Sequence, residues 1–119
     1  MGLTIARFTV SHPTELSRSA EVELLVDTGA VISFVPREIL EGLGVPKQFR
    51  RVFQLASGQT IERDVGLAFF RWDAHVCGAP VVFGEPNDAR LLGVTALEGM
   101  SLQVDPVGKT LRPVPTLAV

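Results

Sequence analysis

The apolar residues of this 119-residue chain fall in short runs that are rich in β-branched side chains and bounded by glycine, proline, asparagine or aspartate. Such runs are typical of strands joined by tight turns, and they are too short for a bundle of long helices. The pattern therefore predicts an all-β domain. The expected strands cover residues 3–10, 21–26, 49–56, 60–63, 65–72, 76–83, 89–93, 101–105 and 109–112.

Two segments depart from this pattern and predict short helices. Residues 36–44 carry proline at the first helical position and glycine just past the end, which favours a helix. Residues 94–100 are expected to form the second helix. A polar loop over 11–20 joins the first two strands into a hairpin, and a turn at 106–108 joins the last two. The tail 113–119 contains prolines and is expected to be a loose end or an interface strand.

The length and composition predict one domain over residues 1–119. Hydrophobic residues make up 46% of the chain, charged residues only 20%, and the mean hydropathy is +0.30. So little charge leaves a thin polar surface for a monomer of this size, which favours an oligomer that covers apolar area.

Charge, cysteine content and hydropathy argue against a nucleic-acid partner, an internal disulfide and a membrane partner. The net charge is −2, and the densest basic cluster is Lys47, Arg50 and Arg51, which is too small for a nucleic-acid site. The lone Cys77 cannot form an internal disulfide, and its apolar neighbours predict a buried, unreactive side chain. No signal peptide or long apolar run is found, so we expect a soluble cytoplasmic protein with no membrane partner.

One tetrapeptide, Asp27-Thr28-Gly29-Ala30, directly follows an apolar strand and occurs once only. An acid on a turn of small residues at the end of a strand is well placed for catalysis, although the same residues taken alone would also suit a simple turn. Carboxylate chemistry that activates water usually needs two acids, one ionised and one protonated. A second identical chain is the simplest source of the other acid.

Three features in this order resemble a retropepsin-type aspartic protease, and the cellular and bacterial members more than the viral ones. They are the apolar residues before Asp27-Thr28-Gly29-Ala30, a glycine-containing hairpin tip, and the later Leu91-Leu92-Gly93 before a short helix. The similarity covers residues 21–105. It implies an acid-protease barrel lobe that acts as a homodimer on peptides or unfolded protein, with no metal and no cofactor.

The resemblance assigns a role to each residue of the catalytic loop. Asp27 would face Asp27 of the second subunit, and two carboxylates about 3 Å apart hold one proton between them. The Thr28 hydroxyl would bond across the dimer. Gly29 would permit a close backbone approach to the carboxylate, Ala30 would leave space for substrate, and Ser33 would tie the loop internally.

The resemblance also assigns a flap and a support. The flap would close over an extended peptide, and the support would pack beneath the catalytic loop and line the pockets. The flap residues are Ala56, Ser57, Gly58 and Gln59, and the support residues are Leu91, Leu92 and Gly93. Two departures from the retroviral pattern, Val94-Thr95 after the glycine and a longer proline-rich tail, leave open how the dimer closes.

Other candidate residues have simpler interpretations. Asp64-Val65-Gly66 lacks the threonine of a second catalytic triplet and is expected to be a bend or bulge in the flap hairpin. Neither His12 nor His75 has spaced partners for a metal. Aromatic residues that we expect to pack in the core or an interface are Trp72, Phe69 and Phe70. Acids that we expect to be solvated are Glu85, Asp88 and Glu98.

Two functions remain after these exclusions. The first is an aspartic endopeptidase in which Asp27 of both chains is catalytic. The alternative is a peptide-binding or dimerisation module with the same fold and weak or no hydrolysis. The intact Asp-Thr-Gly-Ala favours the enzyme, because a pure binder has no reason to keep a costly pair of like charges.

Overall fold

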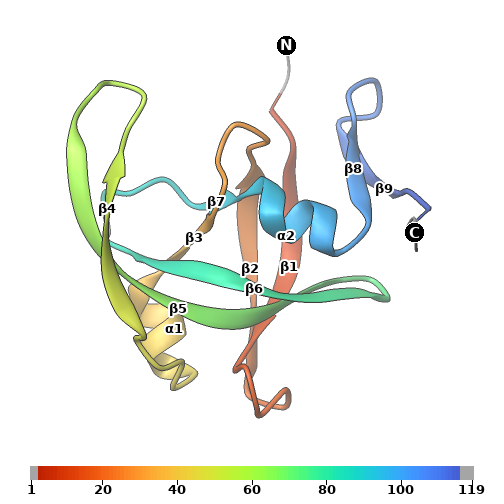
Figure 1. Ribbon diagram of the computed structural model, residues 1–119. Coiled ribbons are helices and arrows are strands. Elements are labelled where there is room, and N and C mark those ends of the chain that lie inside the picture. The colour runs from red at the N-terminus through yellow and green to blue at the C-terminus, as the bar shows by residue number, and fades with distance from the viewer. Residues whose placement is uncertain (1–2, 116–119) are drawn as a thin grey trace.

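The computed structural model of the chain describes residues 3–115. Within this range nine strands and two short helices follow one another (Figure 1). The strands are β1 (Ile5–Ser11), β2 (Ser19–Val26), β3 (Ser33–Pro36), β4 (Phe49–Gln54), β5 (Thr60–Trp72), β6 (His75–Gly84), β7 (Leu91–Leu92), β8 (Leu102–Asp105) and β9 (Thr110–Pro113). The helices are α1 (Arg37–Gly42) and α2 (Val94–Gly99).

Seven strands form one sheet in the order β1-β2-β7-β3-β6-β5-β4, and β1 also pairs with β5. This additional pairing, in which Val10 lies opposite Phe70, closes the sheet into a barrel and leaves β4 outside the ring. Strands β8 and β9 form a separate hairpin. The all-β prediction with two short helices is therefore confirmed.

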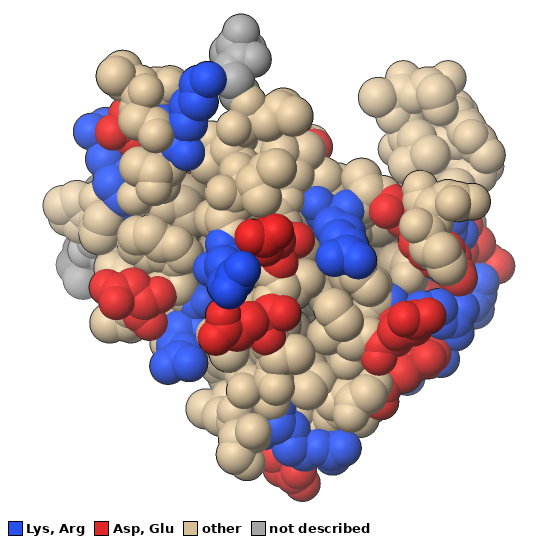
Figure 2. Space-filling view, turned by 180° about the vertical axis from the view of Figure 1, so that it is seen from behind, with Lys and Arg blue, Asp and Glu red and all other residues tan. Residues whose placement is uncertain are grey.

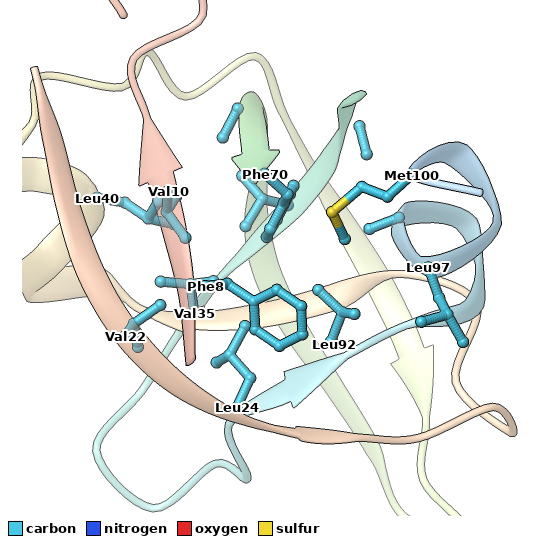
Figure 3. Close-up of a cluster of buried hydrophobic side chains, with 14 of the residues drawn as sticks. Phe8, Val10, Val22, Leu24, Val35, Leu40, Phe70, Leu92, Leu97 and Met100 are labelled. Atoms are coloured by element: carbon cyan, nitrogen blue, oxygen red, sulfur yellow. The ribbon is translucent and has the colours of Figure 1, made fainter. Parts of the chain in front are cut away.

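Alternation along the strands builds the core. Phe8 and Val10 of β1, and Val22 and Leu24 of β2, are buried while the intervening Thr9 and Glu23 are more exposed, as a half-buried strand requires. Figure 3 shows these side chains meeting residues from β3, β5, β7 and both helices around one centre. Burial of this apolar surface stabilises the barrel on which the site is built.

Helix α1 begins one residue later than expected. Pro36 is the last residue of β3, with φ −51° and ψ 133°, so it precedes the helix and does not occupy its first turn. The extended ψ follows from the pairing of Pro36 with Gly84 of β6, which outweighs the local preference of proline for the first helical position. Helix α1 buries Leu40, and Gly44, with φ +75°, follows its end.

The segment expected to bend or bulge is instead part of one continuous strand, β5. Asp64 lies opposite Arg50 of β4, and Val65 lies opposite both Phe49 of β4 and Val82 of β6. The strand thus passes from one partner to the next without interruption. Gly66 is required for packing, because a Cβ there would lie 2.5 Å from the Pro46 carbonyl oxygen.

The C-terminal hairpin is confirmed, and the described part of the tail is attached to it. Pro113 belongs to β9, and the Val114 amide donates to the Ser101 carbonyl at 2.8 Å. These two residues are therefore not a loose end. The rest of the expected tail, residues 116–119, lies outside the described residues.

Candidate active site

Asp27 is the first residue after β2, and its backbone is fixed from both sides. The Asp27 amide donates to the Leu92 carbonyl at 3.0 Å, and the preceding Val26 amide donates to the Thr4 carbonyl at 2.8 Å. Strand β7 lies between β2 and β3, parallel to β2 and antiparallel to β3. The loop predicted to be catalytic, residues 27–33, therefore leaves one strand and returns on the far side of β7.

The turn itself is shaped around the Asp27 carboxylate. The Gly29 amide donates to Oδ1 at 2.9 Å, and the Ala30 amide donates to the Asp27 carbonyl at 3.1 Å. A Cβ at Gly29 would lie 3.2 Å from the same Oδ1, which is closer than ordinary side-chain contact. The small residues thus let the backbone approach the carboxylate and hold it while leaving it partly exposed.

A buried network supports the loop from below. The Gly93 amide donates to the Ser33 hydroxyl at 2.9 Å, and Ser33 is only 1% exposed. The Val94 amide donates to the Ala30 carbonyl at 2.7 Å. A Cβ at Gly93 would lie 2.7 Å from the carbonyl carbon of Ile32, so only glycine fits where the two segments cross.

The structure therefore brings together two segments far apart in the sequence, the catalytic loop and residues 91–93. Leu92 is fully buried, whereas Leu91 lines the groove described below. Thr28 is exposed at the outer edge of the loop, and its hydroxyl has no hydrogen-bond partner within the described part of the chain. An exposed hydroxyl at this place is free to bond with another molecule.

A groove of about 680 Å³ separates the catalytic loop from the hairpin β4–β5. Figure 1 shows the hairpin rising beside the loop on the same side of the barrel. Phe53 of the hairpin packs its ring edge-on against Phe34 of β3, with 5.6 Å between centroids. The groove is lined by Asp27, Gly29, Ala30, Val31, Ile32, Phe34, Arg51, Val52, Phe53, Gln54, Leu55, Ala56, Ile61, Asn87, Asp88, Ala89 and Leu91.

The expected flap residues form the tip of this hairpin. Gly58 has φ +89° with no atom within 4 Å of an added Cβ, and its amide donates to the Leu55 carbonyl at 2.9 Å. Ala56 lines the groove, and the whole tip is exposed. Figure 2 shows an uncharged projection at this corner of the molecule, with acidic and basic side chains gathered below it.

Asp88 was expected to be solvated, and the structure corrects this. Arg63 of β5 donates from Nε to Oδ2 at 2.7 Å and from Nη2 to Oδ1 at 2.9 Å, and the two side chains are only 18% and 13% exposed. The hydrogen bond from Arg63 holds the pKa of Asp88 below its usual value, although partial burial opposes this. Glu85 is likewise paired, with Arg37.

Sequence reasoning missed the Arg63–Asp88 pair, although a signal existed. Arg63 lies two residues before the buried Val65, so in a strand both side chains point to the same, inward side. An arginine there needs a carboxylate partner, because burying an unpaired charge is costly. The pair ties the base of the flap hairpin to the loop that precedes β7.

The remaining candidates are structural. His12 accepts the amide hydrogens of Thr14 and Glu15 at its Nδ1 and so caps a turn, and His75 Nδ1 contacts the Met100 carbonyl at 3.0 Å. Cys77 is half-buried rather than fully buried; its thiol donates to the Ala96 carbonyl, and burial raises its pKa.

Two of the three aromatic candidates pack in the core as expected: Phe70 is fully buried and Trp72 packs at its edge, whereas Phe69 is half-buried and lies outside the core cluster. Among residues 3–115, no group of three or more histidine, cysteine or acidic side chains could hold a metal ion. None of the helices in that range is long and apolar enough to cross a membrane.

Both a family sequence model and solved structures match this chain. A sequence model of the aspartyl protease family matches residues 13–96, more than half of the chain. No curated protein sequence matches. The retroviral protease-like domain of Ddi1 from Leishmania major superposes with a TM-score of 0.58 at 14% identity, covering 94% of this chain and 90% of that one.

Two further structures widen the comparison. A retropepsin-like aspartic protease from Rickettsia conorii superposes with a TM-score of 0.53 at 14% identity, covering 88% of this chain and 89% of that one. A foamy viral protease–reverse transcriptase superposes with a TM-score of 0.55 at 17% identity and covers 79% of this chain, which spans only 12% of that longer protein. The matched family and the shared fold lead to one conclusion: the chain belongs to the aspartyl protease family and has a retropepsin-like fold.

Proposed function

We propose that this chain is an aspartic endopeptidase whose active site is completed by Asp27 of a second copy. The observation that carries the proposal is the position of Asp27, half-exposed on one wall of a groove whose other wall is the hairpin β4–β5. A groove of this shape suits an extended peptide, whose main chain can bond to the hairpin in the manner of an added strand.

The described residues that line the groove offer no second acid for this chemistry. Among the described residues that line the groove, the acids are Asp27 and Asp88, and both oxygens of Asp88 are already bonded to Arg63. Because Arg63 lowers its pKa, Asp88 stays ionised and cannot serve as a proton donor. A symmetric dimer supplies the missing acid with one operation, since each copy contributes the same loop.

The chemistry follows from two carboxylates that share one proton. The ionised Asp27 accepts a proton from a water molecule as the water oxygen attacks the scissile carbonyl carbon. The protonated Asp27 donates its proton to the carbonyl oxygen, which gives a neutral tetrahedral diol. Proton transfer to the amide nitrogen then accompanies cleavage of the C–N bond, releasing an amine and a carboxylic acid.

The flap has two roles in this proposal. When the hairpin closes over the peptide it excludes water from the reacting centre, and it holds the peptide extended across Asp27. The Arg63–Asp88 pair and, next to the tip, the Phe34–Phe53 contact hold the two strands of the hairpin, so closure is confined to the tip itself. The exposed Thr28 is available to bond to the second subunit.

The decisive test compares the wild-type protein with Asp27→Asn, which keeps the shape and removes the charge. We expect cleavage of an unfolded protein between about pH 4 and pH 7 to fall by a factor on the order of 10⁴ in the variant. Native mass spectrometry should show a dimer in active samples. Equal cleavage by both proteins, or cleavage by a strict monomer, would exclude the proposed mechanism.

A second measurement separates an enzyme from a binding module. A statine-type peptide carries the tetrahedral hydroxyl of the proposed intermediate. A catalytic site should bind it at least 100-fold more tightly than the matching plain peptide. Equal affinities would favour the peptide-binding module.

A further inference from the structure

Arg51 lies on the groove side of the flap hairpin. It is two residues before Phe53 in β4 and directly opposite Arg63 of β5, and residues two apart in a strand point to the same side. Phe53 contacts Phe34 across the groove, and Arg51 lines the groove with it. The guanidinium of Arg51 therefore borders the path of a bound peptide, farther from the tip than Phe53.

The charge of Arg51 is uncompensated. Asp27, Arg51 and Asp88 are the charged residues among the described groove lining, and Asp88 is neutralised by Arg63. Arg51 forms no ion pair with any residue between 3 and 115. Asp27, the other charge in the groove, is the group that we assign to catalysis.

The neighbouring Arg50 shows the opposite arrangement. Its side chain lies within ion-pair distance of Glu62, at 3.4 Å, and of Asp64, at 3.1 Å. Two adjacent arginines on one strand thus differ in two respects: they point to opposite faces of the hairpin, and only Arg50 is paired. Arg50 is paired within the hairpin, whereas Arg51 still has its donors free beside the groove.

We propose that Arg51 binds a carboxylate of the substrate, so that the groove selects peptides with an acidic group at the position beside β4. The proposal rests on the assignment of the groove as a peptide site. An arginine fork matches a carboxylate with two parallel hydrogen bonds, and the apolar residues around it reduce competition from water. The carboxylate is either an aspartate or glutamate side chain or the C-terminus of the peptide.

The expected preference is moderate because Arg51 is exposed at the groove edge. A carboxylate should improve kcat/KM about tenfold, between the effect of an exposed ion pair and that of a buried charged hydrogen bond. Added salt should weaken the preference, since exposed charges are screened. Arg51→Met should remove it, and Arg51→Glu should reverse it in favour of peptides with lysine.

The test uses peptide pairs built on one cleaved sequence. Each position in turn carries glutamate or glutamine, and the C-terminus is either free or amidated. A preference for glutamate at one position identifies a side-chain carboxylate, and a preference for the free C-terminus identifies the chain end. Both support the proposal if Arg51→Met abolishes them while Arg50→Met, the matched control, keeps them.

Binding to the Asp27→Asn protein provides a readout that does not need catalysis. Fluorescence anisotropy should show the same tenfold preference for the acidic peptide, and Asp27→Asn/Arg51→Met should lose it. A proteolysis that depends on Asp27 but ignores peptide charge would overturn the role of Arg51 and leave the proposed function intact. Peptide binding that depends on Arg51, without any hydrolysis by the wild type, would retain Arg51 and overturn the enzyme.

Discussion

The floor and the roof of the groove are held in different ways. The floor, residues 27–33 with 91–93, is fixed by hydrogen bonds between distant segments, including the fully buried Ser33–Gly93 bond. The roof, the hairpin β4–β5, is held mainly by pairing between its own two strands, with the Phe34–Phe53 contact next to the tip and one ion pair farther down. Its tip is exposed throughout.

This difference matches what the proposed function would require of each part. A catalytic acid must stay in one geometry, which requires packing and hydrogen bonds that resist local motion. A hairpin that admits and covers a peptide must open at low cost, and segments with few buried contacts open most readily. Each of the following predictions tests how tightly one part of the molecule is held.

The largest effect is expected for Gly93→Ala. The added Cβ would meet backbone atoms of Val31 and Ile32 at 2.7–2.9 Å, and backbone cannot move aside easily, so the free energy of unfolding should fall by about 3 kcal/mol. Urea denaturation measures the change. The control is Gly42→Ala at the end of α1, where no atom lies within 4 Å, and it should cost nothing. Equal effects would mean that the floor is not tightly packed.

Ser33→Ala should cost about 2 kcal/mol, because it leaves the buried Gly93 amide without an acceptor. The matched change in the roof is Ser57→Ala, which removes only an exposed contact with the Gln59 amide at 3.3 Å and should leave stability unchanged. Thermal unfolding of the two variants gives the comparison. If Ser57→Ala were as unstable as Ser33→Ala, the roof would be held as tightly as the floor.

Asp88→Asn should lower the free energy of unfolding by about 1 kcal/mol near pH 7, since it weakens a partly buried ion pair. The pKa of Asp88 is lower in the folded protein than its ordinary value, so the pair stabilises the fold above that ordinary value. This stabilisation is lost as the pH falls from the ordinary pKa of an aspartate through the lower pKa that Asp88 has in the folded protein.

Urea midpoints measured at several pH values test this dependence. The difference between wild type and Asp88→Asn should be constant near neutrality and shrink in acid. Arg50→Met, which breaks a more exposed pair, should have a smaller effect. A difference that grows on acidification would mean that the pKa of Asp88 is not lowered in the folded protein.

The smallest change in global stability is expected for Gly58→Ala at the flap tip. The positive φ costs an alanine about 1 kcal/mol locally, but nothing lies within 4 Å and the tip can relax without disturbing the barrel. The global unfolding free energy should change by less than about 0.5 kcal/mol. Hydrogen exchange should instead show the change confined to the hairpin. A cooperative loss of stability across the molecule would mean that the tip and the floor are coupled.

Several features could be read from the sequence because they depend on neighbouring residues. Alternation indicates that Phe8 and Val10 face the core, although Leu3 and Ile5 of the same run are exposed, and the Asp-Thr-Gly-Ala turn indicates the carboxylate and the small residues around it. Other features could not be read in this way. Pro36 stays in β3 because Gly84 pairs with it, and β5 continues through Asp64-Val65-Gly66 because β4 and β6 pair with it in succession.

The sequence by itself therefore determined the all-β character, the turn that presents Asp27 and the hairpin tip, since periodicity and turn chemistry act over a few residues. Only the tertiary structure decided that Arg63 neutralises Asp88, whereas Arg51 has no acidic partner among the described residues. It also decided that Gly93 must be glycine, because Ile32 crosses above it. These facts depend on which distant segments meet, and the closure of a barrel fixes that through packing that no local pattern records.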